Sequence, residues 1–468
     1  MLSDKAILKR TFFLVNSFPT RLPDIGVRIY KVPWRGVCQQ VFAVWKTLPP
    51  DTEFSGVTMG RMAATTHGLS ASATGRQPTL QAASGRRALG GFFLSGVLFS
   101  FLGAVLPAWG YHLRSDHATV GLYFLFLTFG IYAGSQACHW LVTRTGLRLL
   151  LAVASGLACA GLLALAYLSG PQPPSQRMFA LFLVGGAGAM VNTAVFHAIT
   201  PLYQHDPGAT INLSGGLFGL GCLTTALLTA GAFNYYTVPA MMILLAVIPF
   251  YFMIGFAVGG PFVYTPHSFP SFRKALDDFR SPGAVLFTLL LFFQFGNEWA
   301  IAGWLPLFLI QQLGMSPTSG ILVLALYWTA LLAGRIVAQA MLPRVRHSRL
   351  LLGSVLAALL GCVLLSMTEK MGGAVTGIIL IGGGFASIYP LTVESIAHRF
   401  PYYHPGFFGG IFSLGLMGGL LTPGLLGFAA QEWGVGTVML LPALGSIMVC
   451  VLVLLIWLET RLTRGVAV

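Results

Sequence analysis

Long apolar segments dominate the chain from residue 89 onward. Each has about 20 residues or more, the length that an α-helix needs to cross a hydrocarbon core about 30 Å thick. Backbone polar groups inside that core must be paired internally, so unbroken runs of this length predict helices. We expect twelve transmembrane helices, over residues 89–112, 118–142, 147–169, 178–203, 209–232, 236–257, 284–312, 317–342, 349–368, 372–399, 406–430 and 434–458.

Composition supports an integral membrane protein. Charged residues make up 9% of the 468 and hydrophobic residues 56%, whereas a soluble domain carries about 25% charged residues. The net charge of +14 does not indicate a nucleic-acid partner, because 12 of the 27 basic residues precede residue 88 and the rest lie mostly in short loops. The expected partners are the lipid bilayer, a small-molecule solute and a proton, with the protein acting as a monomer.

The first 88 residues differ from the rest. They contain no apolar run of 18 residues, and Phe12–Val15 is too short for the core of a signal peptide. Residues 63–85 are rich in Ala, Ser, Thr, Gly and Gln, which predicts a disordered cytoplasmic extension. Two interpretations stay open: a genuine tail, or a start codon assigned too early, with Met59 or Met62 closer to the first helix.

Basic residues near the predicted helix ends indicate the orientation. Thirteen lie on the side of the amino end and three on the other side. Lys and Arg concentrate in cytoplasmic loops, so we expect both termini in the cytoplasm. The chain shows no organelle-targeting signal, which suits a bacterial inner membrane. The thirteen are Arg86, Arg87, Arg144, Arg148, Arg273, Lys274, Arg280, Arg344, Arg346, Arg349, Arg399, Arg461 and Arg464, against Arg114, Arg177 and Lys370.

An internal repeat of about 200 residues organises these helices. Residues 215–221 (Gly-Gly-Leu-Phe-Gly-Leu-Gly) recur as residues 409–415 (Gly-Gly-Ile-Phe-Ser-Leu-Gly). Each copy holds six helices, an even number, so both halves have the same orientation, as in transporters with parallel repeats. We expect an all-α membrane protein with two parallel six-helix halves. The halves are residues 89–257 and 284–459, joined by a cytoplasmic linker at 258–283 and followed by a cytoplasmic tail at 460–468.

Twelve helices in a 6+6 parallel repeat resemble the major facilitator superfamily. The loop after the second helix is similar to that superfamily's G-x-x-x-D-R-x-G-R-R signature. Arg144, Gly146 and Arg148 match it, whereas His139 and Thr143 replace its first Gly and its Asp. The resemblance implies alternating access to a central cavity lined by helices 1, 4, 7 and 10. It places Arg144 among the gating residues.

The second half resembles the fucose/galactose–proton symporter group of this superfamily. The residues that carry this likeness are 296–298 (Gly-Asn-Glu), 303–306 (Gly-Trp-Leu-Pro) and 383–390 (Gly-Gly-Phe-Ala-Ser-Ile-Tyr-Pro). The resemblance implies the symport of a sugar with a proton. One departure from it is that helices 1 to 6 carry no carboxylate in their interiors.

Glu298 is the most prominent ionisable residue in a predicted helix. It lies 14 residues into the seventh helix, about 21 Å along its axis and near the middle of the membrane. A charge there costs at least about 2.5–3.5 kcal/mol, and burial favours the protonated form. We expect Glu298 to couple proton movement or bind substrate, with Gln294 and Asn297 bonding sugar hydroxyls and Trp304 stacking on the sugar ring. The other interpretation is a buried Glu with a packing role.

Two further pairs of candidate residues are predicted, one from the repeat and one from equal depth in the membrane. Asn192 and Tyr389 are equivalent by an offset of 197 residues, and we expect both to contact substrate. Arg335 and Glu394 lie one to two turns from the same ends of their helices, which predicts an ion pair that closes the cytoplasmic side. His197, which the same offset relates to Glu394, is expected to be a satisfied interfacial histidine.

No motif indicates covalent chemistry. The chain has no P-loop, H-E-x-x-H or G-x-S-x-G motif, and its six cysteines include no C-x-x-C pair. We therefore expect neither an enzyme nor a bound metal or cofactor. The favoured function is proton-coupled transport of a small polar solute, with a sugar as the favoured solute. Two alternatives are a proton-antiporting efflux protein for drugs or metabolites with the same fold, and a membrane-embedded sensor that transports nothing.

Overall fold

The computed structural model describes residues 77–113, 116–169, 173–260, 262, 272–407 and 409–465, and every regular element among them is an α-helix. These residues belong to one compact unit, Ser70–Val468. The prediction of a disordered extension falls mostly on residues outside this description. At its end, however, helix α3 already begins at Gln77, before the first predicted span.

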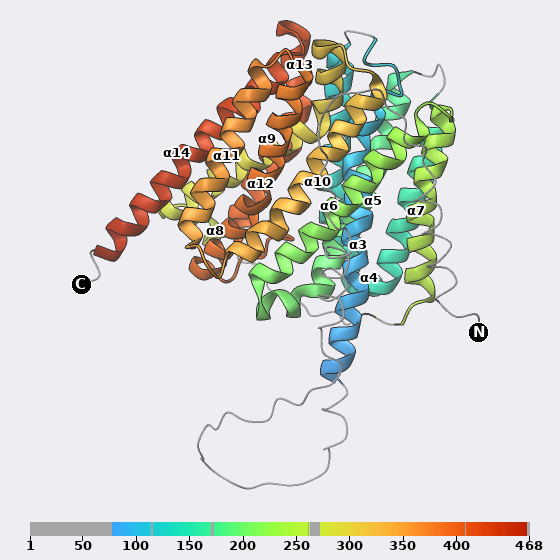
Figure 1. The fold of residues 1–468 in the computed structure, drawn as a ribbon. Helices are drawn as coiled ribbons and strands as arrows, with labels where there is room; N and C mark the ends of the chain where they lie inside the picture. The colour runs from blue at the N-terminus through green and yellow to red at the C-terminus, as the bar shows by residue number, and fades with distance from the viewer. Residues whose placement is uncertain are drawn as a thin grey trace, which may run out of the picture. The chain divides into compact units, whose positions relative to one another are not determined.

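The helices follow the predicted order of spans (Figure 1). They are α3 (Gln77–Val105), α4 (His117–Tyr167), α5 (Pro174–His205), α6 (Pro207–Ala232), α7 (Val238–Val258), α8 (Phe272–Asp278), α9 (Pro282–Leu313), α10 (Pro317–Met341), α11 (His347–Met367), α12 (Met371–Arg399), α13 (Gly410–Trp433) and α14 (Thr437–Gly465).

Helix α4 holds two membrane spans. Its 51 residues would extend about 76 Å at 1.5 Å per residue, more than twice the thickness of the hydrocarbon core. Gly146 breaks it with φ 74° and ψ 160°, a backbone conformation that is open to glycine and strained for other residues. Eleven of the described helices are long and apolar enough to cross a membrane, and the break in α4 makes them twelve spans.

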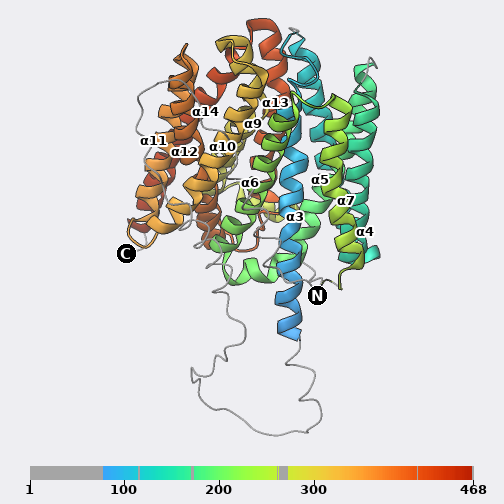
Figure 2. The same cartoon turned by 45° about the vertical axis from the view of Figure 1, so that its right-hand side comes forward.

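Equivalent helices pair in the two halves. Helix α3 packs on α6 in the first half, as α9 packs on α13 in the second; α5 packs on α4, as α12 packs on α10 and α11. The halves meet chiefly through α4 against α13 and α6 against α10. Figure 2 shows the second half, α9 to α14, beside the first. The short helix α8 lies in the linker, and the membrane face that it occupies is called the α8 face below.

Glycines bring the halves into backbone contact toward the opposite face. A Cβ on Gly121 of α4 would collide with the backbone of Gly424 and Gly427 of α13. Nearby, the Thr128 hydroxyl donates to the carbonyl of Leu420 at 2.6 Å. Small residues let transmembrane helices approach this closely. This interface therefore depends on the absence of side chains at a few positions.

Glycines also allow close helix contact inside the first half, and this gives a prediction about stability. A Cβ on Gly130 would clash with the backbone of Phe182, so we expect Gly130→Ala to destabilise the protein by about 1–3 kcal/mol. A Cβ on Gly353 would meet no atom within 4 Å, so Gly353→Ala serves as the matched control and should be neutral or stabilising by up to about 1 kcal/mol. Thermal unfolding of the two purified variants in detergent measures this difference, and equal midpoints would contradict it.

Candidate functional site

A cavity of about 210 Å³ lies between the two halves. This is many times the space that one water molecule needs, and it is enough for a small solute. Its walls come from α3, α4, α5 and α6 of the first half and α9, α10, α12 and α13 of the second. A site at the interface of the repeats is the position expected for a substrate in a transporter of this architecture.

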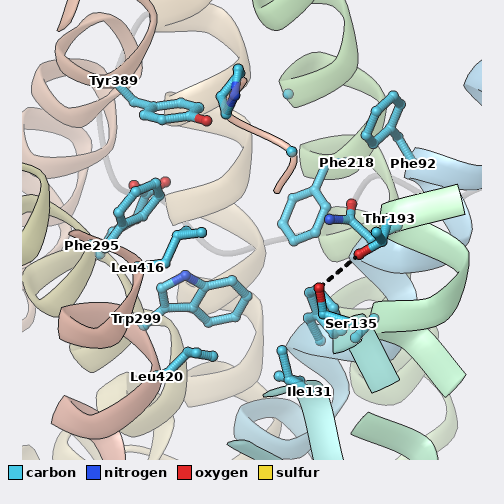
Figure 3. A pocket seen from close by; sticks show the side chains of 18 of the residues that line it. Phe92, Ile131, Ser135, Thr193, Phe218, Phe295, Trp299, Tyr389, Leu416 and Leu420 are labelled. Carbon is cyan, nitrogen blue, oxygen red and sulfur yellow. Dashed lines mark hydrogen bonds between the residues drawn. The ribbon is translucent and has the colours of Figure 1, made fainter. Parts of the chain in front are cut away.

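Most of the cavity wall is aromatic or aliphatic. Figure 3 shows side chains of the two halves facing each other, with the hydrogen bond between Ser135 and Thr193 on the side of the first half. The labelled residues of the second half are Phe295, Trp299, Tyr389, Leu416 and Leu420; those of the first half are Phe92, Ile131, Ser135, Thr193 and Phe218.

Two charged side chains, Glu298 and Arg335, are found among the described residues that line the cavity. Glu298 comes from the middle of α9, whereas Arg335 comes from α10, six residues before that helix ends at Met341. They do not form an ion pair within 4 Å, although both side chains border the same space. The cavity thus holds one acid and one base that are not bonded to each other.

The Arg335 guanidinium crosses the interface between the halves. The residue is 8% exposed, and its Nε and Nη1 atoms have no hydrogen-bond partner among the described residues. On the other side of the interface, a Cβ on Gly215 of α6 would collide with the guanidinium. The glycine at position 215 therefore makes the space that the arginine head group occupies.

The predicted ion pair between Arg335 and Glu394 is not formed. Glu394 Oε1 instead lies 3.3 Å from Nε2 of His347, at the start of α11. Similar depth along two helices did not bring the groups together, because Arg335 is directed toward α6 and Glu394 toward α11. Arg144, the other predicted gating residue, is exposed and lies over the ring of Trp140, 3.9 Å from its centre.

Three of the predicted substrate contacts lie outside the cavity lining. Asn297 is buried against α14, where its Nδ2 donates to Ser446 Oγ at 3.4 Å. Trp304 is fully buried, and its indole N–H donates to the carbonyl of Pro423 at 2.9 Å. Gln294 is also fully buried and does not line the cavity. Neighbouring positions on a helix point about 100° apart, so adjacency to Glu298 in sequence did not bring Asn297 to the same space.

The repeat located two residues of the lining. Asn192 of α5 and Tyr389 of α12, equivalent by the offset of 197 residues, both border the cavity. Trp299 borders it too, and sequence reasoning missed this residue. Its ring centre lies 6.3 Å from that of Phe99 and 6.1 Å from that of Phe218, so it joins an aromatic cluster across the two halves. Its position directly after Glu298 was the available signal, but aromatic residues are common in membrane helices.

A segment between α12 and α13 separates the cavity from the α8 face. We name residues 403–407 the plug segment. The ring of Phe407 lies 4.4 Å from that of His197, and the ring of His404 lies 4.3 Å from that of Tyr203. His197 is buried and is hydrogen-bonded to His139 at 3.1 Å. The plug segment of the second half is thus seated on α4 and α5 of the first half.

The linker helix α8 holds this plug segment. Tyr403 donates its hydroxyl hydrogen to Asp278 Oδ2 at 2.8 Å, and Lys274 Nζ donates to Asp278 Oδ1 at 2.9 Å. Burial opposes ionisation of Asp278, but the hydrogen bonds from Lys274 and the tyrosines outweigh it and hold the pKa of that carboxyl below its usual range. The hydrogen bond to Asp278 raises the pKa of Lys274. The linker between the halves is thereby bonded to the segment that closes the cavity.

The chemistry available at the cavity is proton exchange and non-covalent binding. Within the described part of the chain, no three His, Cys, Asp or Glu side chains gather in a group that could hold a metal ion. The carboxyl of Glu298 can carry a proton, the guanidinium of Arg335 can bind an anion, and the aromatic walls can cover an apolar surface.

Comparison with known proteins adds the family. The model of the Major Facilitator Superfamily matches residues 88–419. An uncharacterized MFS-type transporter of Yersinia pestis is 22% identical over 345 residues, which cover 73% of this chain and 87% of the relative.

Two solved structures share the fold. FucP, a transporter of the same superfamily in its outward conformation, matches with a TM-score of 0.54 and 15% identity over 80% of this chain and 98% of the other. A variant of the E. coli fucose:proton symporter FucP matches with a TM-score of 0.55 and 15% identity over 81% and 99%.

The plug segment gives a first prediction about the site. A Cβ on Gly406 would collide with the ring of Phe196, so we expect Gly406→Ala to displace the plug segment and open the α8 face. Spin labels on Gln204 and His398, both exposed, report the separation of the halves by double electron–electron resonance in a cysteine-free background. Gly409→Ala is the control, because a Cβ there meets no atom within 4 Å. Identical distance distributions in the two variants would contradict the gating role.

The contact between α8 and the plug segment gives a second prediction, on pH. Folding lowers the pKa of Asp278, so its contribution is present above the unfolded value of about 3.9 and is lost as pH falls through the folded value. Folding raises the pKa of Lys274, so that contribution is lost only above about pH 10.4. Asp278→Asn should therefore cost about 1 kcal/mol, equally at every pH from 5 to 8. Thermal unfolding of both proteins over this range measures it, and a difference that varies across the range would contradict it.

Proposed function

We propose, because the chain belongs to the Major Facilitator Superfamily, that this transporter moves a small organic solute together with a proton by alternating access. The observation that carries the coupling is the position of Glu298. It is the one carboxylate among the described residues that line the cavity between the halves. A carboxyl in such a place can take a proton from one side of the membrane and release it to the other.

Alternating access follows from the contacts between the halves. Toward the face opposite α8, backbone contacts between Gly121 and Gly427 hold α4 against α13. At the α8 face, the plug segment is seated on α4 and α5. Exchange of one set of contacts for the other would open the cavity to each side in turn. The excess of basic residues on the α8 side supports a cytoplasmic location for that face.

The identity of the solute is a separate question from the coupling. A sugar is supported by the likeness to FucP, described as a fucose:proton symporter. Against it, Gln294, Asn297 and Trp304, which were expected to contact a sugar, lie outside the lining. The aromatic walls favour a solute with an apolar part.

The walls also support the second candidate function, proton-antiporting efflux of amphipathic compounds. A symporter moves the solute in the same direction as the proton, whereas an antiporter moves it in the opposite direction. A sensor without transport would move no solute in either direction.

Substitution of Glu298 tests the coupling. Proteoliposomes loaded with a pH-sensitive dye report proton entry when fucose, other neutral sugars, organic acids or the cationic amphiphile ethidium are added. We expect a transported solute to acidify the lumen with the wild type. With Glu298→Gln we expect at least a ten-fold smaller proton flux, because the amide carries no exchangeable acid proton, while solute exchange at equal concentrations continues.

The exposed Glu369, in the loop between α11 and α12, supplies the control Glu369→Gln, which should behave as the wild type. Proton flux in Glu298→Gln equal to that of the wild type would refute the coupling role. Acidification on loss of solute from the lumen, instead of on its entry, would favour the efflux alternative.

A further inference from the structure

No carboxylate among the described residues makes an ion pair with the Arg335 guanidinium within 4 Å, and Glu298, which borders the same cavity, interacts with it only at longer range. An unpaired charge is costly to bury, so membrane proteins pair such groups or place them at a polar site. The acids on the helices packed around it have other roles. Asp206 caps α6 by accepting from the N–H of Ala209 at 3.0 Å, Glu394 faces His347, and Glu298 is not within 4 Å.

We propose that the cavity binds a small organic monocarboxylate, whose carboxylate is held by Arg335 and whose apolar or aromatic body lies between the walls. This inference rests on the proposed function, in which the same cavity carries the transported solute. Two nitrogens of the guanidinium are buried without hydrogen-bond partners, and the group borders the cavity. An arginine fork matches the two oxygens of a carboxylate in a bidentate pair.

The remaining lining argues for a monovalent anion with an apolar body. Arg335 is the single cation among the described lining residues, so a second negative charge, as on a phosphate dianion, would stay uncompensated. Trp299, Phe218 and Phe295 provide ring faces for an aromatic or branched aliphatic group. Several lining hydroxyls are already bonded within the protein: Thr128 donates to Leu420, Ser135 and Thr193 bond each other, and Ser214 donates to Thr210.

Charge balance in the cavity links this anion to the proton. In the empty cavity, an ionised Glu298 offsets Arg335 and the net charge is zero. A bound carboxylate takes over this offset, and the Glu298 carboxylate then repels the bound anion until it gains a proton. The loaded cavity is neutral again with one anion and one proton bound. A neutral cavity is the state in which the halves can exchange their contacts at least cost.

Calorimetric titration of the full-length protein in detergent tests the inference without requiring transport. The probes are phenylacetate and benzoate, with the uncharged phenylacetamide, inorganic phosphate and fucose for comparison. We expect a carboxylate to bind at least ten-fold more tightly than phenylacetamide, phosphate or fucose. We expect Arg335→Gln to weaken carboxylate binding at least ten-fold. Arg344→Gln, in the exposed turn that follows α10, should leave the affinity unchanged.

Gly215 provides a second variant that keeps the arginine. Gly215→Ala displaces the guanidinium and should also weaken carboxylate binding, whereas Gly216→Ala, where a Cβ meets no atom within 4 Å, should not. If Arg335→Gln fails to fold, this pair decides the question. Failure of both carboxylates to bind, equal affinity in Arg335→Gln or Gly215→Ala, or preferential binding of phosphate or fucose would overturn the inference.

The outcomes separate this inference from the proposed function. Sugar-driven proton flux that depends on Glu298, with no carboxylate binding, would leave the coupled transporter standing and remove the carboxylate as solute. Carboxylate binding that depends on Arg335, with no solute-driven proton flux, would retain the anion site and remove the coupling.

Discussion

The cost of a charged group in hydrocarbon governs this structure. A chain with 9% charged residues and twelve membrane spans has little capacity to compensate such charges. Glu298 and Arg335 nevertheless lie within the spans, and the fold brings both to the space between the halves. In this cavity, water, a proton or a solute can compensate for the desolvation of both groups. The cavity lies between the two halves, which in the proposed mechanism move relative to each other during transport.

Small residues at the helix interfaces allow the helices to approach closely. Gly121 and Gly427 let α4 and α13 touch through their backbones, and Gly215 leaves room for the Arg335 head group. Such surfaces have few interlocking side chains, and the proposed alternating access requires them to separate and meet again. The contacts at the α8 face are of a different kind. Aromatic rings and histidines of the plug segment pack on the first half, and Tyr403 is hydrogen-bonded to α8. The two faces therefore close by different chemistry.

The sequence predicted the family and the fold, and both are confirmed by the family match and the structure. The positions and lengths of the apolar segments determine where the membrane spans begin and end. The internal repeat determines how the spans of the two halves correspond. At the site, the sequence did not predict reliably in which direction each side chain leaves its helix. Asn192 and Tyr389 were found because symmetry relates them, whereas Asn297 was misplaced because its side chain faces α14. The Arg335–Glu394 pair was wrong because depth along a helix does not fix the direction of a side chain. The plug segment was missed because residues 406–409 were read as the start of a helix that begins at Gly410.

The central claim is that the cavity stays neutral because an anion and a proton bind together. Calorimetric titration of phenylacetate in a series of buffers with different heats of ionisation counts the protons taken up by the protein at neutral pH. The account predicts uptake of about one proton for each carboxylate bound by the wild type and none by Glu298→Gln. Carboxylate binding by the wild type without proton uptake would contradict it.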